Sequence, residues 1–189
     1  MYRILLLTFT SFYFLIGCNT ESQKDQYYQL VVLYENHAWG FQQQGIYLTN
    51  NGELFSFINN ETMTDNKGIL EGKSYSEIYL NSLLTTSSQL LEAIDKTVLQ
   101  RLSTKIEKVE NTNISESTYT CADAGKLSFI IFEHNSTSGE YSPIILEQRG
   151  DIASANLSED AKTIVDWLDS KLKEYQIVIL DGCESPFKS

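Results

Sequence analysis

The apolar residues of this chain recur with two different spacings, one typical of β-strands and the other of helices. A nearly continuous run of β-forming residues, Tyr27–Tyr34, predicts a strand that is covered on both faces. Two strand-like runs, Gly45–Thr49 and Leu54–Ile58, flank an Asn-Gly pair at positions 51 and 52. Because both residues of this pair tolerate positive φ, we expect the two runs to form a β-hairpin. A polar loop, Asn59–Gly68, follows it.

Helical signals come next. Ser74-Tyr75-Ser76-Glu77 matches a capping box, and it predicts a short helix with the apolar residues Ile78, Leu80, Leu83 and Leu84. Thr86-Ser87-Ser88-Gln89 is a second capping box and predicts the start of a longer helix. The apolar stripe of that helix recurs every three or four residues: Leu91, Ile94, Val98, Leu102, Ile106 and Val109. We expect the stripe to contact the core, and the polar segment Asn111–Ser117 to end the helix.

A second β unit is predicted from about Tyr119 onward. Lys126–Glu133 has the composition of a strand, His134–Glu140 that of a polar loop, and Tyr141–Gln148 that of the returning strand. Pro143 cannot donate a hydrogen bond to a neighbouring strand. The returning strand is therefore expected to lie at an edge of the sheet or to begin only after Pro143.

The C-terminal part contains the best-marked helix. Ser158 has the properties of an N-cap, and Glu159 and Asp160 place negative charge in the first turn, where the helix dipole favours it. One face of this helix is apolar: Ala161, Ile164, Val165, Leu168 and Leu172. A short final strand is predicted at Gln176–Leu180.

These elements predict an α+β fold. A mainly antiparallel sheet built from two hairpin units packs against a central helix and a C-terminal helix. The sequence has no internal repeat and only two prolines, so residues 27–189 are expected to form a single domain.

The first 18 residues have a different character. Met1-Tyr2-Arg3 carries a positive charge, and Ile4–Ile16 is an apolar stretch that is too short to span a membrane as a helix. Leu15-Ile16-Gly17-Cys18 follows, with a small residue directly before the cysteine. This arrangement resembles the signal peptide of bacterial lipoproteins.

The resemblance implies cleavage before Cys18. Residues 1–17 would then be a signal peptide, and 18–26 an acylated cysteine with a polar tether. In that family the cysteine thiol receives a diacylglyceryl group and the new amine a fatty acid such as palmitate. Two acyl signals suffice for stable anchoring. The resemblance thus places the protein in the bacterial cell envelope, attached to a membrane through its lipid. Asn19 favours the outer membrane, facing the periplasm or the surface, where the host has two membranes.

The chain has a formal net charge of −11, from 14 basic and 25 acidic residues. Cleavage before Cys18 removes Arg3 and makes the charge more negative by one. A surface of this charge repels phosphate groups, which argues against nucleic acid as a partner. It favours a basic protein partner, although solubility alone also explains an acidic chain.

Besides Cys18, the chain contains Cys121 and Cys183. An even pair in an exported chain predicts a disulfide, and two unrelated thiols are the alternative. A Cys121–Cys183 bridge would close a loop of about 60 residues, for which chain entropy predicts roughly 4 kcal/mol of stabilisation.

The most distinctive internal stretch is Cys121-Ala122-Asp123-Ala124-Gly125. It predicts a tight turn held by the disulfide, in which the Asp123 side chain caps nearby amides; an Asp presented from a rigid loop for function is the alternative.

Tyr119-Thr120-Cys121 leading into Lys126-Leu127-Ser128-Phe129 is locally similar to membrane-bound lysozyme inhibitors. The Ser-Gly-x-x-Tyr inhibitory loop of that family is missing, and the predicted helices depart from its all-β fold, so we do not assign the chain to it.

Catalytic and metal-binding motifs are missing from the sequence. The only histidines, His37 and His134, lie in predicted loops without metal-ligand spacing, and Trp39 is a possible interface residue. No serine-hydrolase, Walker or dinucleotide-binding pattern occurs. We therefore name no catalytic residue, cofactor or metal ligand.

The sequence favours a non-enzymatic envelope lipoprotein that binds a protein or envelope component, such as an inhibitor or immunity-type module. An envelope hydrolase using carboxylates and a purely structural lipoprotein are the alternatives.

Overall fold

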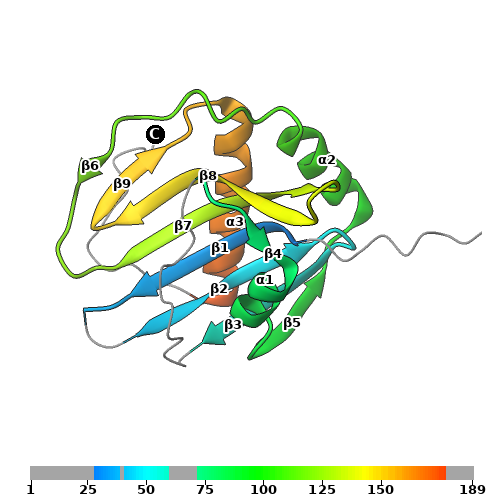
Figure 1. The fold of residues 1–189 in the computed structure, drawn as a ribbon, viewed down its shortest axis with the longest axis horizontal. Coiled ribbons are helices and arrows are strands. Elements are labelled where there is room, and N and C mark those ends of the chain that lie inside the picture. The colour runs from blue at the N-terminus through cyan, green and yellow to red at the C-terminus, as the bar shows by residue number, and fades with distance from the viewer. Residues whose placement is uncertain (1–27, 39–40, 60–71, 178–189) are drawn as a thin grey trace, which may run out of the picture.

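The structure is a computed structural model that describes residues 28–38, 41–59 and 72–177 (Figure 1). Within these ranges the chain forms one nine-stranded sheet and three helices. In chain order they are β1 (Tyr28–Asn36), β2 (Gln42–Thr49), β3 (Glu53–Asn59), β4 (Tyr75–Ser76), α1 (Glu77–Leu84), β5 (Ser88–Ala93), α2 (Lys96–Ile106), β6 (Thr118–Tyr119), β7 (Lys126–Asn135), β8 (Glu140–Gly150), β9 (Ile152–Ala155) and α3 (Glu159–Tyr175).

The strand order is β5-β3-β2-β1-β7-β8-β9-β6, and β4 pairs with β8 beside this path. Every pairing is antiparallel. The predicted α+β class with a mainly antiparallel sheet is therefore confirmed. None of the helices in the described ranges has the length and apolar character needed to cross a membrane.

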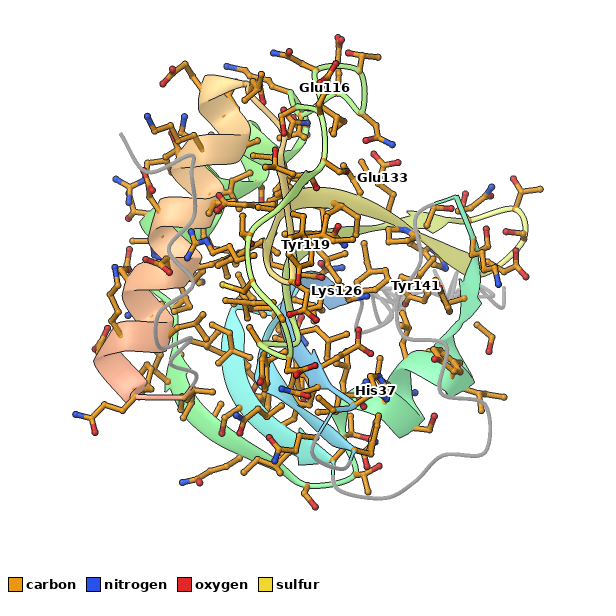
Figure 2. The ribbon with its side chains drawn as sticks, turned by 90° about the vertical axis from the view of Figure 1, so that its left-hand side faces the viewer. His37, Glu116, Tyr119, Lys126, Glu133 and Tyr141 are labelled. Carbon is orange, nitrogen blue, oxygen red and sulfur yellow. The ribbon has the colours of Figure 1, made fainter. Side chains whose placement is uncertain are left out.

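The helices cover both faces of the sheet, with α3 on one side and α1 on the other (Figures 1 and 2). Leu30, Val32 and Phe129 lie in the core on the α2–α3 face, while Val31, Leu33 and Ile130 lie in the core on the α1 face. The central strand β1 is thus buried from both sides. This explains why its apolar run has no polar alternation.

The first hairpin forms where the Asn-Gly pair predicts it. Gly52 has a φ of +82°, and its N–H donates to the Thr49 carbonyl at 2.9 Å, which closes the turn between β2 and β3. On β2, a Cβ added to Gly45 would lie 1.8 Å from the Val32 carbonyl oxygen. Only glycine permits this close approach of β1 and β2.

The second capping box does not begin a helix. Ser88–Ala93, predicted as the first turns of a helix, is strand β5, which pairs with β3 and completes that end of the sheet. The helix begins only at Lys96. Its N-cap is Asp95, whose side chain accepts a hydrogen bond from the Thr97 amide at 2.8 Å. Leu102 and Val109 of the predicted stripe are buried against the core, as expected.

The first capping box predicts the right helix with the wrong cap. The N-cap of α1 is Ser76, whose hydroxyl accepts from the Tyr79 amide, while Ser74 lies before β4. Of its four apolar residues, Leu80, Leu83 and Leu84 are buried, while Ile78 is 82% exposed.

The second β unit is confirmed, and its strands are longer than predicted. Pro143 lies inside β8 opposite Phe132 of β7, so the strand does not begin after it. On its other side β8 pairs with β4 at Tyr141 and with β9 from Glu147 onward. Pro143 falls between these two segments, where none of the described strands pairs with the outer edge of β8.

The C-terminal helix α3 is confirmed from its N-cap Ser158 to its apolar face, all five residues of which are buried. At its end, Gln176 adopts a left-handed conformation with a φ of 54° instead of starting a strand. Residues 178–180 of the predicted final strand lie outside the described residues, as does most of the predicted loop after β3.

A partly buried ion-pair network joins α3 to β8. Arg149 contacts Glu147 and Asp169, each at 2.6 Å, and its guanidinium lies 4.6 Å from the centre of the Phe129 ring. Asp169 also contacts Lys173 at 2.6 Å. Burial opposes the charged form of the Asp169 carboxyl, but hydrogen bonds from Lys173 and Arg149 outweigh this effect and lower its pKa below the ordinary value.

Candidate functional site

Three residues singled out in the sequence lie outside the described residues: Cys18, Trp39 and Cys183. Cys121 lies two residues after the end of β6 and is disulfide-bonded. The bridge between Cys121 and Cys183 stays a prediction, because neither of the two other cysteines is described.

The Cys121–Gly125 stretch bends sharply at Ala122 and Asp123, with a φ of 60° at Asp123 and 76° at Gly125. The carboxylate that caps it is that of Asp151, which accepts from the Ala124 amide at 2.8 Å; the sequence interpretation gave this role to Asp123. Asp123 is exposed, and its carbonyl oxygen accepts from the Asn36 side chain at 3.2 Å.

Each of the two histidines lies against an aromatic ring. His37 is exposed, and its ring lies 5.4 Å from that of Phe41; the His134 ring lies 4.9 Å from that of Tyr141. Within the described ranges, no group of three or more His, Cys, Asp or Glu side chains has the arrangement of a metal site.

Two hollows flank the tip of the β7–β8 hairpin, with volumes of about 520 and 370 Å³. They share Glu133 and Ser142, and among the described residues Glu133 is the one carboxylate that lines either of them. Ser142 contributes a hydroxyl that lies 3.4 Å from the Ser74 hydroxyl. Glycoside hydrolysis ordinarily uses two facing carboxylates. The described residues around these two hollows supply only one.

A smaller hollow of about 190 Å³ lies between β9 and α3 and is lined by Glu147 and Glu159. Glu147 is the carboxylate that pairs with Arg149 in the buried network. It therefore serves to hold α3 on the sheet, and the hollow does not present two free carboxylates to a substrate.

The structure also joins four polar side chains that the sequence interpretation did not connect. Glu35 contacts Lys126 at 3.1 Å and accepts from Gln43 at 3.2 Å, and Gln43 accepts from Asn59 at 3.3 Å. The register places these residues opposite one another on β7, β1, β2 and β3. Glu35, Gln43 and Asn59 are buried. We interpret this row as structural, because each member satisfies its neighbour across the sheet.

The most unusual surface lies at the β6 end of the sheet, which we call the β6 edge. It consists of residues 110–125 and 150–160. Four large apolar side chains are exposed on it: Ile114 (40%), Tyr119 (70%), Ile152 (50%) and Leu157 (54%). Tyr119 pairs with Ile152, so their side chains lie next to each other on one face. Figure 2 looks onto this edge, where Glu116 and Tyr119 are labelled.

The two segments of the β6 edge are acidic, although Lys105 of α2 and Lys162 of α3 lie at its border. Its two segments contain six acidic residues and no Lys or Arg: Glu110, Glu116, Asp123, Asp151, Glu159 and Asp160. Asp160 is paired with Lys105 of α2 at 2.8 Å. Exposed apolar side chains within a polar surround are typical of interaction surfaces. The chemistry of this one suits a cationic partner.

Hydrogen bonds hold the β6 edge against the rest of the sheet. The Ser115 amide donates to the Ala155 carbonyl at 2.8 Å, and the Asn156 side chain donates to the Glu110 carbonyl at 2.8 Å. The Thr120 amide donates to the Asp151 carbonyl at 3.0 Å. The exposed apolar side chains are thus carried on a segment with a defined conformation.

The sequence interpretation did not find this surface. Ile114 lies in a segment with a polar composition, and β9, a short run of small residues, carries little strand signal. The one available signal was the lack of basic residues between Lys108 and Lys126. No protein-family model matches the chain, and no curated protein or solved structure is significantly similar to it.

Proposed function

We propose that this chain is a lipid-anchored protein of the bacterial cell envelope, without enzymatic activity, whose folded domain binds a basic protein. An inhibitor or immunity-type module directed at a basic toxin or lytic enzyme is the version that we favour. The proposed anchor is Cys18, joined to the domain by the polar tether 19–26.

The β6 edge is the observation that carries the proposal. It combines exposed apolar side chains with six acidic residues and no basic ones. Apolar contact supplies affinity, and complementary charge speeds association and selects the partner. A net charge of −11 over the whole chain adds a long-range attraction to cations.

The competing hydrolase proposal has weaker support. The described residues around the two hollows at the β7–β8 hairpin include a single carboxylate, Glu133, and in the smaller hollow Glu147 is held in an ion pair. A purely structural role would not require an exposed apolar row on an acidic edge. The binding proposal accounts for more of the described surface than either alternative.

Affinity capture from envelope extract tests the proposal, with the soluble form from residue 19 onward as bait. We expect basic proteins to be enriched at low salt and released as the salt concentration rises, because screening weakens contacts between exposed charges. An unrelated acidic protein of similar net charge serves as the control bait. Failure to enrich any basic protein beyond that control would overturn the proposal.

A further inference from the structure

We propose that the outer side of the β6 edge binds an extended basic segment of the partner, which lies alongside β6 as an additional strand. This inference rests on the proposed function and specifies where and how the partner binds. The segment has the chemistry of an alternating sequence of aliphatic residues and Lys or Arg.

The backbone of the edge is suited to accept a strand. The Leu157 amide donates to the Asn113 carbonyl, and the Ser115 amide donates to the Ala155 carbonyl, each at 2.8 Å. Peptide groups of successive residues in a strand point to opposite sides. The N–H and C=O of Ile114, which lies between Asn113 and Ser115, therefore point away from the sheet.

The same argument applies at Tyr119. The next residue, Thr120, donates its amide inward to the Asp151 carbonyl at 3.0 Å. The peptide groups of Tyr119 accordingly point outward. Among the described residues, β6 is the last strand in the sheet order, and no described strand pairs with its outer side (Figure 1). An incoming strand can pair with such an edge.

The side chains define the composition of the incoming segment. Tyr119 and Ile152 form an adjacent exposed pair, and Ile114 lies farther along on the same face, opposite Asn156. Aliphatic side chains of an added strand would cover this row. The exposed acids Glu110, Glu116 and Asp123 lie on the same segment as β6, where they would meet the cationic side chains.

A second copy of this chain is a poorer occupant of the edge. Two such edges would bring twelve acidic residues together, six from each copy, with no basic residue from either segment between them. Like charges in an interface cost free energy. The acidic composition therefore also protects the exposed edge against pairing with itself.

The test uses the full-length chain in neutral detergent micelles and a fluorescent peptide of alternating Lys and Val. We expect a rise in anisotropy with saturable binding that weakens with salt. Two control peptides are one of alternating Glu and Val and one with all Lys before all Val. The dissociation constant of each should be at least about tenfold higher. Equal binding of the block peptide would overturn the strand-like mode.

Two variants locate the peptide. Tyr119→Ser combined with Ile152→Thr, and separately Glu116→Lys, should each weaken binding about tenfold, because one removes the apolar row and the other reverses an edge charge. The matched controls, Ile78→Thr and Glu77→Lys, change an exposed apolar residue and an acid on α1. Unchanged affinity in both edge variants, with unchanged melting temperature, would overturn the assignment to this edge.

The outcomes separate this inference from the proposed function. If envelope capture enriches basic proteins equally with wild type and with both edge variants, the function stands and the β6 edge is the wrong surface. If the alternating peptide binds at the edge but capture enriches no basic protein, the recognition chemistry stands and the proposed function fails.

Discussion

At the scale of single residues, Arg149 and its partners show how a charged group is accommodated at the margin of the core. The guanidinium forms ion pairs with Glu147 and Asp169 and lies over the Phe129 ring. These three contacts offset the free energy that its desolvation costs. The contacts of Arg149 with Asp169 and Phe129 do not follow from sequence spacing, because these two residues lie on other elements, whereas Glu147 lies two residues before Arg149 on the same strand. The link between β8 and α3 is therefore a feature that only the fold reveals.

Asp169 provides a test of this network through pH. Its pKa is lowered in the folded protein, so it contributes stability that is fully present above its unfolded pKa of about 3.9 and is lost as the pH falls toward the folded pKa. We expect Asp169→Asn to lower the free energy of unfolding at pH 7. Urea denaturation should show that the difference from wild type narrows below about pH 4.

The control for this experiment is Asp166→Asn, an exposed acid on the same helix. A pH-independent difference between wild type and Asp169→Asn would contradict the role of the network. So would an equally large, pH-dependent effect of the control.

At the scale of elements, the sequence predicts long amphipathic segments well and short ones poorly. The buried face of α3 follows from the helical spacing of its five apolar residues, because only one side of the helix carries all of them. By contrast, Leu91 and Ile94 fit the spacing of the next helix, yet Leu91 belongs to β5. Residues 88–93 form a strand because they pair with the edge of β3, and this tertiary pairing outweighs the local helical pattern.

The cap of α1 is a second case where local chemistry is ambiguous, because Ser74 and Ser76 both precede an apolar run. We expect Ser76→Ala to destabilise the protein by about 1 kcal/mol, since its hydroxyl accepts from the Tyr79 amide. Ser74→Ala should have a clearly smaller effect. Chemical denaturation of the two variants measures this, and equal losses would count against the assignment of the cap.

At the scale of the whole molecule, the sequence predicts the fold class and the sign of the surface charge but not the surface itself. Charge is a sum over residues and needs no structure. The β6 edge exists only because residues 113–120 lie against β9, which brings Tyr119 next to Ile152. Such a surface follows from pairings between distant segments.

The anchor prediction is tested at Cys18. Cys18→Ser should leave an uncleaved or unacylated precursor, because the hydroxyl cannot take the place of the thiol in lipid attachment. Metabolic labelling with a fatty acid measures this directly. Normal labelling of the variant would refute the lipoprotein assignment.

The disulfide prediction is linked to the anchor. If the thiol of Cys18 carries lipid, Cys183 is the one cysteine left to pair with the disulfide-bonded Cys121. The mature protein should then migrate faster on a non-reducing gel than after reduction, and Cys183→Ser should abolish the difference. A shift that persists in Cys183→Ser would point to another pairing.

Site-specific photo-crosslinking in living cells tests the central claim most directly. The full-length anchored protein would carry p-benzoylphenylalanine in place of Tyr119, which is 70% exposed on the β6 edge, or in place of Ile78 on α1 as the control. The account predicts a defined crosslinked product from position 119 that contains a basic protein, and no such product from position 78. No basic product from position 119, or the same product from both positions, would contradict it.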